Sequence, residues 1–145
     1  MKLHPIHQSL RSAPIDDVAA ETRAQLDAVG SPPRGRVAVT GGSRGIRNIV
    51  AILRTAGEWL RENGAEPFLA PCMGSHNGAT AAGQRAMLET LGMTETAVEM
   101  PIHSSMDVRQ VGETPTGEPV WMDRHCHDAD GVLVVNRVKL HTSFG

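Results

Sequence analysis

The sequence of 145 residues predicts an α/β fold: a Rossmann-like open, mostly parallel sheet with flanking helices and a β-hairpin insertion. A strand, a glycine-rich loop and a helix follow one another twice, and a continuous apolar run at 131–136 comes later in the chain. Alternating residues on both sides of 112–117 predict the hairpin. We expect an N-terminal helix and linker at 1–35 and one α/β domain at 36–145.

The first predicted element is a helix within the first 30 residues. Asp16 and Asp17 stand near its start and Gly30 lies beyond its end. Its apolar stripe is weak and consists of Val18, Ala19, Leu26 and Val29. The segment 31–35, with the sequence Ser-Pro-Pro-Arg-Gly, breaks regular structure and predicts a connector.

The first strand–loop–helix unit begins with a short β-branched run at 37–40, followed by the loop 41–45. The helix after it has apolar residues at helical spacing, and Asn63-Gly64 predicts its end. Those residues are Ile46, Ile49, Val50, Leu53 and Leu60. The unit predicts a parallel strand whose carboxyl end opens into a ligand-binding loop.

The second unit repeats this order. A buried strand is predicted at 67–70, a loop at 71–78, and a helix from about Thr80 to Leu91, with Gly92 after it. The hairpin, at 108–122, is expected on the edge of the main sheet or outside it. The run 131–136 predicts a central parallel strand covered on both faces. Because the chain stops nine residues after this run, we expect it to be truncated, with a C-terminal domain absent.

Composition excludes several classes of function. The net charge of -2 and a charged fraction of 21% argue against nucleic acid as a partner, and 3% aromatic residues argue against base stacking. No window approaches the roughly 20 apolar residues of a membrane span, and no secretion signal is visible, so we expect a cytoplasmic protein without a membrane partner. Cys72 and Cys126 are expected to be free thiols.

Candidate site residues follow the predicted strands. In an open parallel sheet, loops at the carboxyl ends of strands meet at one edge, where ligands bind. Three loops qualify here: 41–45, 74–78 and 137–145. They contain Ser43, Arg44, Ser75, His76, Lys139 and His141.

The loop 41–45 is predicted to bind an anion. Glycines admit a close ligand, the following helix offers N–H groups, and Arg44 fits a phosphate or carboxylate. Alternatively, the glycines only form a tight turn and Arg44 is a solvated charge. The spacing matches neither a dinucleotide fingerprint nor a Walker motif, which disfavours NAD and ATP.

Two histidines are candidates for acid/base chemistry. His76 lies between Gly74 and Gly78, where small neighbours leave an imidazole open to substrate, and His141 follows the run 131–136. Each alone is more typical of a hydrogen-bonding surface histidine. The segment 125–130 contains metal-ligand residue types, but neighbouring helical side chains diverge, so we interpret it as a solvated helix end and predict no metal site.

Several motifs together resemble the amino-terminal domain of nickel-dependent lactate racemases. The resemblance runs from about Val37 to the last residue and spans about the first third of a usual family member. The motifs are Thr-Gly-Gly-Ser-Arg-Gly-Ile at 40–46, Pro-Phe at 67–68, Met-Gly-Ser-His-Asn-Gly-Ala-Thr at 73–80, Gly-Gln at 83–84 and Asn-Arg-Val-Lys-Leu-His-Thr at 136–142.

The resemblance implies a two-domain racemase or epimerase that acts on a 2-hydroxy acid or a similar hydroxylated substrate. Its cofactor would be the nickel-pincer nucleotide, pyridinium-3,5-bisthiocarboxylic acid mononucleotide nickel, which exchanges a hydride with the substrate. By motif, His76 and His141 match the two acid/base histidines. The loop that grips the cofactor phosphate and the substrate carboxylate matches Gly41, Gly42, Ser43 and Arg44.

The resemblance also sets limits. Lactate racemase has an aspartate where Gly41 stands, so the substrate need not be lactate. The family's tethering lysine and nickel-binding histidine fall beyond Gly145, so we expect the cofactor in the full-length protein only and an inactive fragment. Alternatives are a phosphate- or nucleotide-binding module without turnover, and a scaffold with neither ligand nor chemistry. The expected partner is a small-molecule substrate, and the sequence is compatible with a homo-oligomer.

Overall fold

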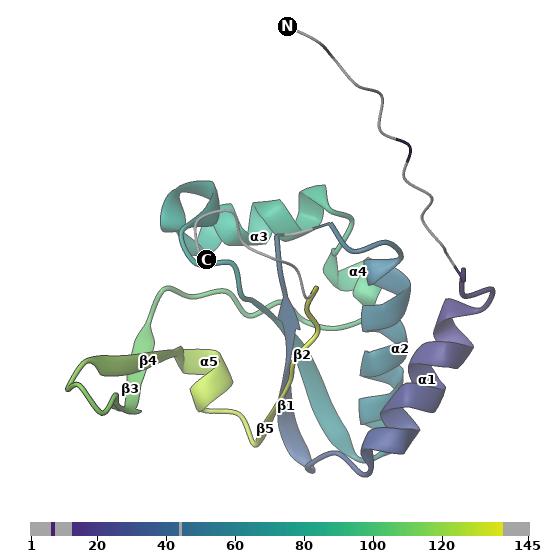
Figure 1. Cartoon of the computed structure of the whole chain (residues 1–145), viewed down its shortest axis with the longest axis horizontal. Helices are drawn as coiled ribbons and strands as arrows, with labels where there is room; N and C mark the ends of the chain where they lie inside the picture. Colours follow the sequence, from purple (N-terminus) through teal and green to yellow (C-terminus); the bar gives the residue numbers. More distant parts are fainter. Residues whose placement is uncertain (1–6, 8–12, 44, 138–145) are drawn as a thin grey trace, which may run out of the picture.

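The computed structural model describes residue 7 and residues 13–43 and 45–137, and its strands and helices alternate as the sequence predicts (Figure 1). Both strand–loop–helix units and the hairpin are present. In chain order the elements are α1 (Val18–Val29), β1 (Gly35–Gly41), α2 (Ile49–Glu62), β2 (Ala65–Pro71), the 3₁₀ turn η1 (His76–Ala79), α3 (Ala81–Thr90), α4 (Glu95–Val98), β3 (Val108–Glu113), β4 (Pro119–Asp123), α5 (Arg124–His127) and β5 (Gly131–Leu133).

The main sheet is parallel and has the order β2-β1-β5. β1 and β2 pair along their whole length, from Gly35 opposite Ala65 to Gly41 opposite Pro71. Beyond β2, Ile102 forms an isolated parallel bridge with Leu69. The carboxyl ends of β1 and β2 therefore lie side by side. The predicted open α/β sheet is confirmed.

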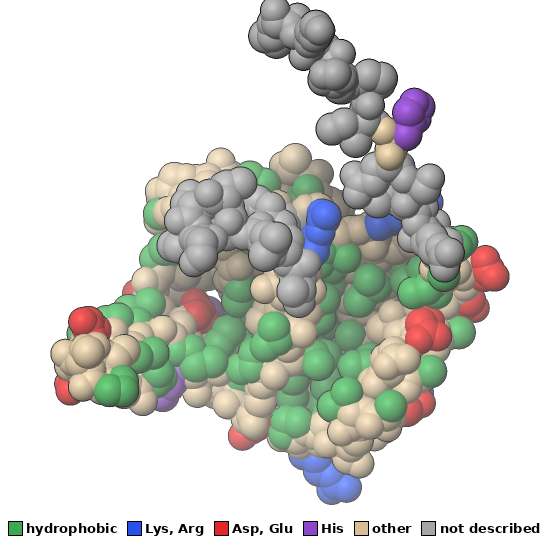
Figure 2. Space-filling model, in the orientation of Figure 1, with side chains coloured by type: hydrophobic (Ala, Val, Ile, Leu, Met, Phe, Trp, Pro, Cys, Tyr) green, Lys and Arg blue, Asp and Glu red, His purple; other side chains and the backbone are tan. Residues whose placement is uncertain are grey.

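The prediction that 131–136 is a central strand covered on both faces is wrong. Among the described residues β5 is an edge strand, and only Gly131–Leu133 is paired, to β1. Leu133 and Val135 pack against the core, whereas Val134 is 67% exposed. Side chains along the run therefore point alternately toward the core and toward solvent. The sequence pattern does not show this alternation, because the side chains on both sides are apolar. A groove of about 520 Å³ lies between β5, α1 and α2, and hydrophobic side chains gather in this hollow (Figure 2).

α1 and α2 cover one face of the sheet (Figure 1). Asp17 caps α1 by accepting a hydrogen bond from the N–H of Ala20, as the acidic residues near the predicted start suggested. The indole N–H of Trp59 on α2 donates to Asp27 on α1 over 2.7 Å and ties the two helices together. Burial of apolar side chains from strands and helices supplies most of the stability of this layer. Its fully buried members include Val37, Val39, Leu53, Leu60 and Leu69.

α5 and the hairpin lie on the other side of the sheet (Figure 1). Cys126 of α5 is buried against Ala38, Phe68 and Ala70. The prediction that the segment 125–130 is a solvated helix end is therefore wrong for this residue. β3 and β4 form a separate antiparallel pair, which confirms the predicted hairpin outside the main sheet. Every residue of β3 is exposed.

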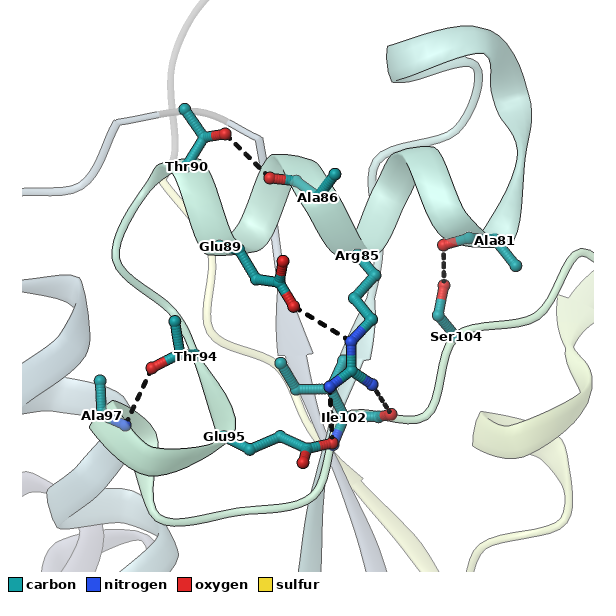
Figure 3. Close-up of polar contacts among 10 residues, drawn as sticks. All are labelled: Ala81, Arg85, Ala86, Glu89, Thr90, Thr94, Glu95, Ala97, Ile102 and Ser104. Atoms are coloured by element: carbon teal, nitrogen blue, oxygen red, sulfur yellow. Dashed lines mark hydrogen bonds and ion pairs between the residues drawn. The ribbon is translucent and has the colours of Figure 1, made fainter.

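Arg85 fastens α3 to the chain that follows it (Figure 3). Its guanidinium contacts the carboxylates of Glu89 and Glu95 and donates to the backbone oxygen of Ile102. Glu95 in turn accepts the N–H of Ile102 over 2.9 Å, and this bond, followed by that from Arg85, lowers the pKa of Glu95. The segment beside β2 is thereby held against α3. None of the helices described is long and apolar enough to cross a membrane.

Candidate functional site

The candidate site starts where β1 and β2 end. The N–H of Cys72 donates to the carbonyl of Gly41 over 2.7 Å, which extends the ladder of the sheet by one bond beyond the paired residues. The loops after the two strands therefore leave from fixed, adjacent points. This is the convergence expected at the carboxyl edge of a parallel sheet.

Ser43 and His76 meet across these two loops. Nδ1 of His76 lies 3.0 Å from Oγ of Ser43 and also contacts the carbonyl oxygen of Met73. A carbonyl oxygen only accepts, so the bond to Met73 requires a proton on Nδ1. In the neutral imidazole the lone pair is then on Nε2. The side chain of His76 is exposed, which leaves Nε2 available to take a proton from a ligand.

The turn that presents His76 has an unusual backbone. Asn77, Gly78 and Ala79 have φ values of 52°, 79° and 51°, three successive left-handed residues of which only glycine adopts this conformation freely. The side chain of Asn77 donates to the carbonyl of Gly83 over 2.7 Å. The amide of Gln84, a buried polar residue of α3, donates to the carbonyl of Gly74 over 2.7 Å. Both ends of the turn are therefore fixed to α3.

Sequence reasoning did not assign roles to these supporting residues. Gly83 and Gln84 entered only as part of the resemblance. A buried amide on an otherwise ordinary helix is a signal that could have pointed to Gln84, because buried polar side chains need partners. For Asn77, only its position between His76 and Gly78 was informative, since asparagine tolerates the left-handed region.

The third loop approaches the first. Arg137 donates from Nη1 to the carbonyl of Gly45 over 3.1 Å. The hydroxyl of Thr40 lies 2.9 Å from the N–H of Val135 and 3.2 Å from its carbonyl, and so joins the end of β1 to the chain after β5. Two of the predicted site residues, Arg44 and His141, lie outside the described residues, as does Lys139.

The glycines of the first loop differ in their surroundings. A Cβ on Gly41 would come 3.0 Å from the side chain of Leu88, so this residue is packed against α3. No atom of the described residues lies within 4 Å of the corresponding position on Gly42, where a ligand has room. The helix that follows begins at Ile49, and Asn48 before it makes no side-chain capping bond. Uncapped N–H groups at a helix start favour an anion.

The donor set suits phosphate better than metal. Backbone N–H groups and the Ser43 hydroxyl are donors for a phosphate or carboxylate. Across residues 13–43 and 45–137, no group of three His, Cys, Asp or Glu side chains is placed to hold a metal ion. The groove beside α1 and the cleft of about 200 Å³ next to Cys72 are not lined by Ser43 or His76. In this pair, on the loops after β1 and β2, His76 is exposed and Ser43 is half-buried.

Comparison with known protein families identifies a family for most of the chain. The sequence model of a family described as the lactate racemase N-terminal domain matches residues 42–145, which is more than half of the chain. The matched range begins inside the first candidate loop and includes Ser43, His76 and Arg137. No curated protein and no solved structure matches the chain.

Proposed function

Because the chain belongs to the lactate racemase N-terminal domain family, we propose that it is the N-terminal part of a racemase or epimerase. The substrate class is a 2-hydroxy acid or a similar molecule with a hydroxyl on its stereocentre. The contact between Ser43 and His76 is the observation that most supports this proposal, since it brings an anion-binding hydroxyl and an acid/base imidazole to the same edge of the sheet.

His76 acts as the acid/base group on one face of the substrate. The carbonyl of Met73 holds the Nδ1 proton, so Nε2 takes the proton of the substrate hydroxyl and later returns it. Since the side chain is exposed on a turn fixed at both ends, substrate reaches the imidazole without displacing it. His141, which lies outside the described residues, is proposed as the acid/base group on the opposite face.

The cofactor proposed is the nickel-pincer nucleotide. When bound, it would supply a reversible hydride acceptor for the substrate carbon. The open space at Gly42, the Ser43 hydroxyl and the start of α2 fit its phosphate. Among the described residues, no cluster of His, Cys, Asp or Glu side chains is placed to bind a metal ion. The fit between site and cofactor therefore concerns only the cofactor phosphate, and we expect the nickel ligands to come from other residues.

Racemisation by the full-length gene product, produced together with the enzymes that make the pincer, tests the proposal. A panel of single-enantiomer 2-hydroxy acids is incubated with wild type, His76→Ala and His127→Ala. His127 is the matched control because it is an exposed histidine that bonds to Asp128, away from the candidate loops. We expect His76→Ala to lower kcat by at least about 100-fold with nickel still bound, and His127→Ala to retain activity.

Other outcomes would redirect the proposal. Full activity in His76→Ala would remove this residue from the acid/base role. Binding of inorganic phosphate without turnover of any substrate, in a protein that contains the cofactor, would favour the alternative of a phosphate- or nucleotide-binding module.

A further inference from the structure

Cys72 and Cys126 approach each other on the face of the sheet that α5 covers. Phe68 and Ala70 of β2 pack against Cys126, and side chains alternate along a strand. Cys72, two residues after Ala70, continues this row, because its N–H still bonds to Gly41 in the manner of the ladder. The two thiols come from positions far apart in the chain and differ in access: Cys72 is exposed and Cys126 is buried.

Asp123 lies beside both cysteines. Its carboxylate caps α5 by accepting the N–H of Cys126 over 3.0 Å. It also lines, with Cys72, a cleft of about 200 Å³ that is open to solvent. A base is thus placed next to the buried thiol, and a small molecule can reach the exposed one.

The thiols also influence each other's acidity. A hydrogen bond from Cys126 lowers the pKa of Cys72, despite the opposing effects of burial and of Asp123. That same bond, followed by burial, raises the pKa of Cys126. Cys72 is therefore the group that ionises first, and the thiolate is the reactive form of a cysteine.

We propose that Cys72 and Cys126 form an oxidisable dithiol that reduces hydroperoxides and closes to an intramolecular disulfide. The inference does not depend on the proposed racemase function. It assigns Cys72 as the residue attacked by oxidant and Cys126 as the thiol that completes the disulfide.

The chemistry has two steps. The Cys72 thiolate attacks a peroxide oxygen; an S–O bond forms, the O–O bond breaks, and the leaving alkoxide or hydroxide takes a proton to become an alcohol or water. Cys126 then gives its proton to Asp123 and attacks the Cys72 sulfur; an S–S bond forms and hydroxide leaves as water with that proton. Two thiols are oxidised and one hydroperoxide is reduced.

Hydrogen peroxide added to the reduced full-length protein tests the proposal. We expect the intact monomer to lose two hydrogens by mass and both thiols to resist alkylation under denaturing conditions, with reductant restoring them. Two alkylatable thiols after exposure, or disulfide-linked dimers in place of the intramolecular bond, would overturn the proposal.

Variants separate the two steps. Cys72→Ser, at an exposed position, is expected to slow peroxide consumption at least about tenfold. Cys126→Ser is expected to stop at a sulfenic acid that dimedone traps on Cys72. Asp123→Asn keeps an oxygen that accepts the N–H of Cys126 but loses the charge, and should slow disulfide closure about tenfold without changing the first step. Equal closure rates in Asp123→Asn and wild type would remove Asp123 from the reaction.

Discussion

The backbone oxygen of Asn77 lies against Gly83 so closely that a Cβ at position 83 would come 2.1 Å from it. This approach holds the left-handed turn after His76 against the start of α3. The Cβ would also come 2.8 Å from the hydroxyl of Thr80, which caps the helix. The turn can therefore adopt this shape only when the residue at position 83 has no side chain.

Gly83→Ala is predicted to displace this turn. Alanine is normally the better helix residue, so a loss of stability here would report the clash alone. We expect the free energy of unfolding, measured by urea denaturation, to fall by about 1–3 kcal/mol. Gly42→Ala is the matched control, because among residues 13–43 and 45–137 no atom lies within 4 Å of its Cβ position. Similar losses in both variants would contradict the prediction.

Thr40→Val is predicted to loosen the connection between β1 and the chain after β5. Valine has the same shape but leaves the N–H of Val135 without the partner it now has at 2.9 Å. The free energy of unfolding should decrease by about 1–2 kcal/mol. Thr40→Ser retains the hydroxyl and should lose less. If valine is as stable as threonine, the hydroxyl does not hold this segment.

Ser43→Ala is predicted to weaken binding more than chemistry. The carbonyl of Met73 still fixes the Nδ1 proton of His76, so the imidazole keeps its function when the serine hydroxyl is removed. In the racemase assay we expect KM, or the concentration of cofactor needed, to rise about tenfold while kcat changes by less than about threefold.

Ser75→Ala is the comparison for this variant, since Ser75 directly precedes His76 and makes no capping hydrogen bond. A fall in kcat as large as that of His76→Ala would mean that Ser43 takes part in proton transfer.

Acid is predicted to destabilise the protein through His103. Its ring stacks on Phe68 with centroids 4.6 Å apart, and its Nδ1 is buried without a partner among the described residues. Burial first, then the nearby His125 and Arg36, lower the pKa of His103, while Glu95 opposes them. Because the unfolded chain then takes up the proton at higher pH than the folded one, the free energy of unfolding should fall as the pH decreases from 6.5.

His103→Phe keeps an aromatic ring on Phe68 and removes the titrating group. We expect it to flatten the change in urea stability between pH 8 and pH 5, and to raise stability at pH 8 by about 1 kcal/mol. The exposed His7→Phe should leave the pH dependence as in wild type. An unchanged slope in His103→Phe would assign the acid sensitivity to other groups.

Much of the fold followed from the sequence, because hydrophobic spacing and turn residues determine its elements locally. Helix α2 and its end at Asn63, and the pairing of the two loops that bear Ser43 and His76, needed only periodicity and the edge rule of parallel sheets. The position of β5 was predicted wrongly. A continuous apolar run predicts a strand that is covered on both faces. The exposure of Val132 and Val134 depends instead on which other elements pack against β5, and the run itself does not specify them.

The details of the site were beyond sequence reasoning for a different reason. The proton position on His76 depends on where the Met73 carbonyl points, and the shape of the turn depends on the contact between Asn77 and Gly83. Both depend on the position of a backbone carbonyl oxygen in a loop, that of Met73 or that of Asn77, which residue types alone do not specify.

The left-handed turn from Asn77 to Ala79 has a thermodynamic consequence for ligand recognition. A loop that orders only when ligand arrives subtracts the entropy of ordering from its affinity. Here the unfavourable backbone angles are imposed during folding by two hydrogen bonds between the turn and α3. Asn77 donates to the carbonyl of Gly83, and Gln84 of α3 donates to the carbonyl of Gly74. A ligand that reaches His76 therefore meets a surface already in shape, and binding at this turn should show a small entropic penalty and a rate close to that of simple encounter.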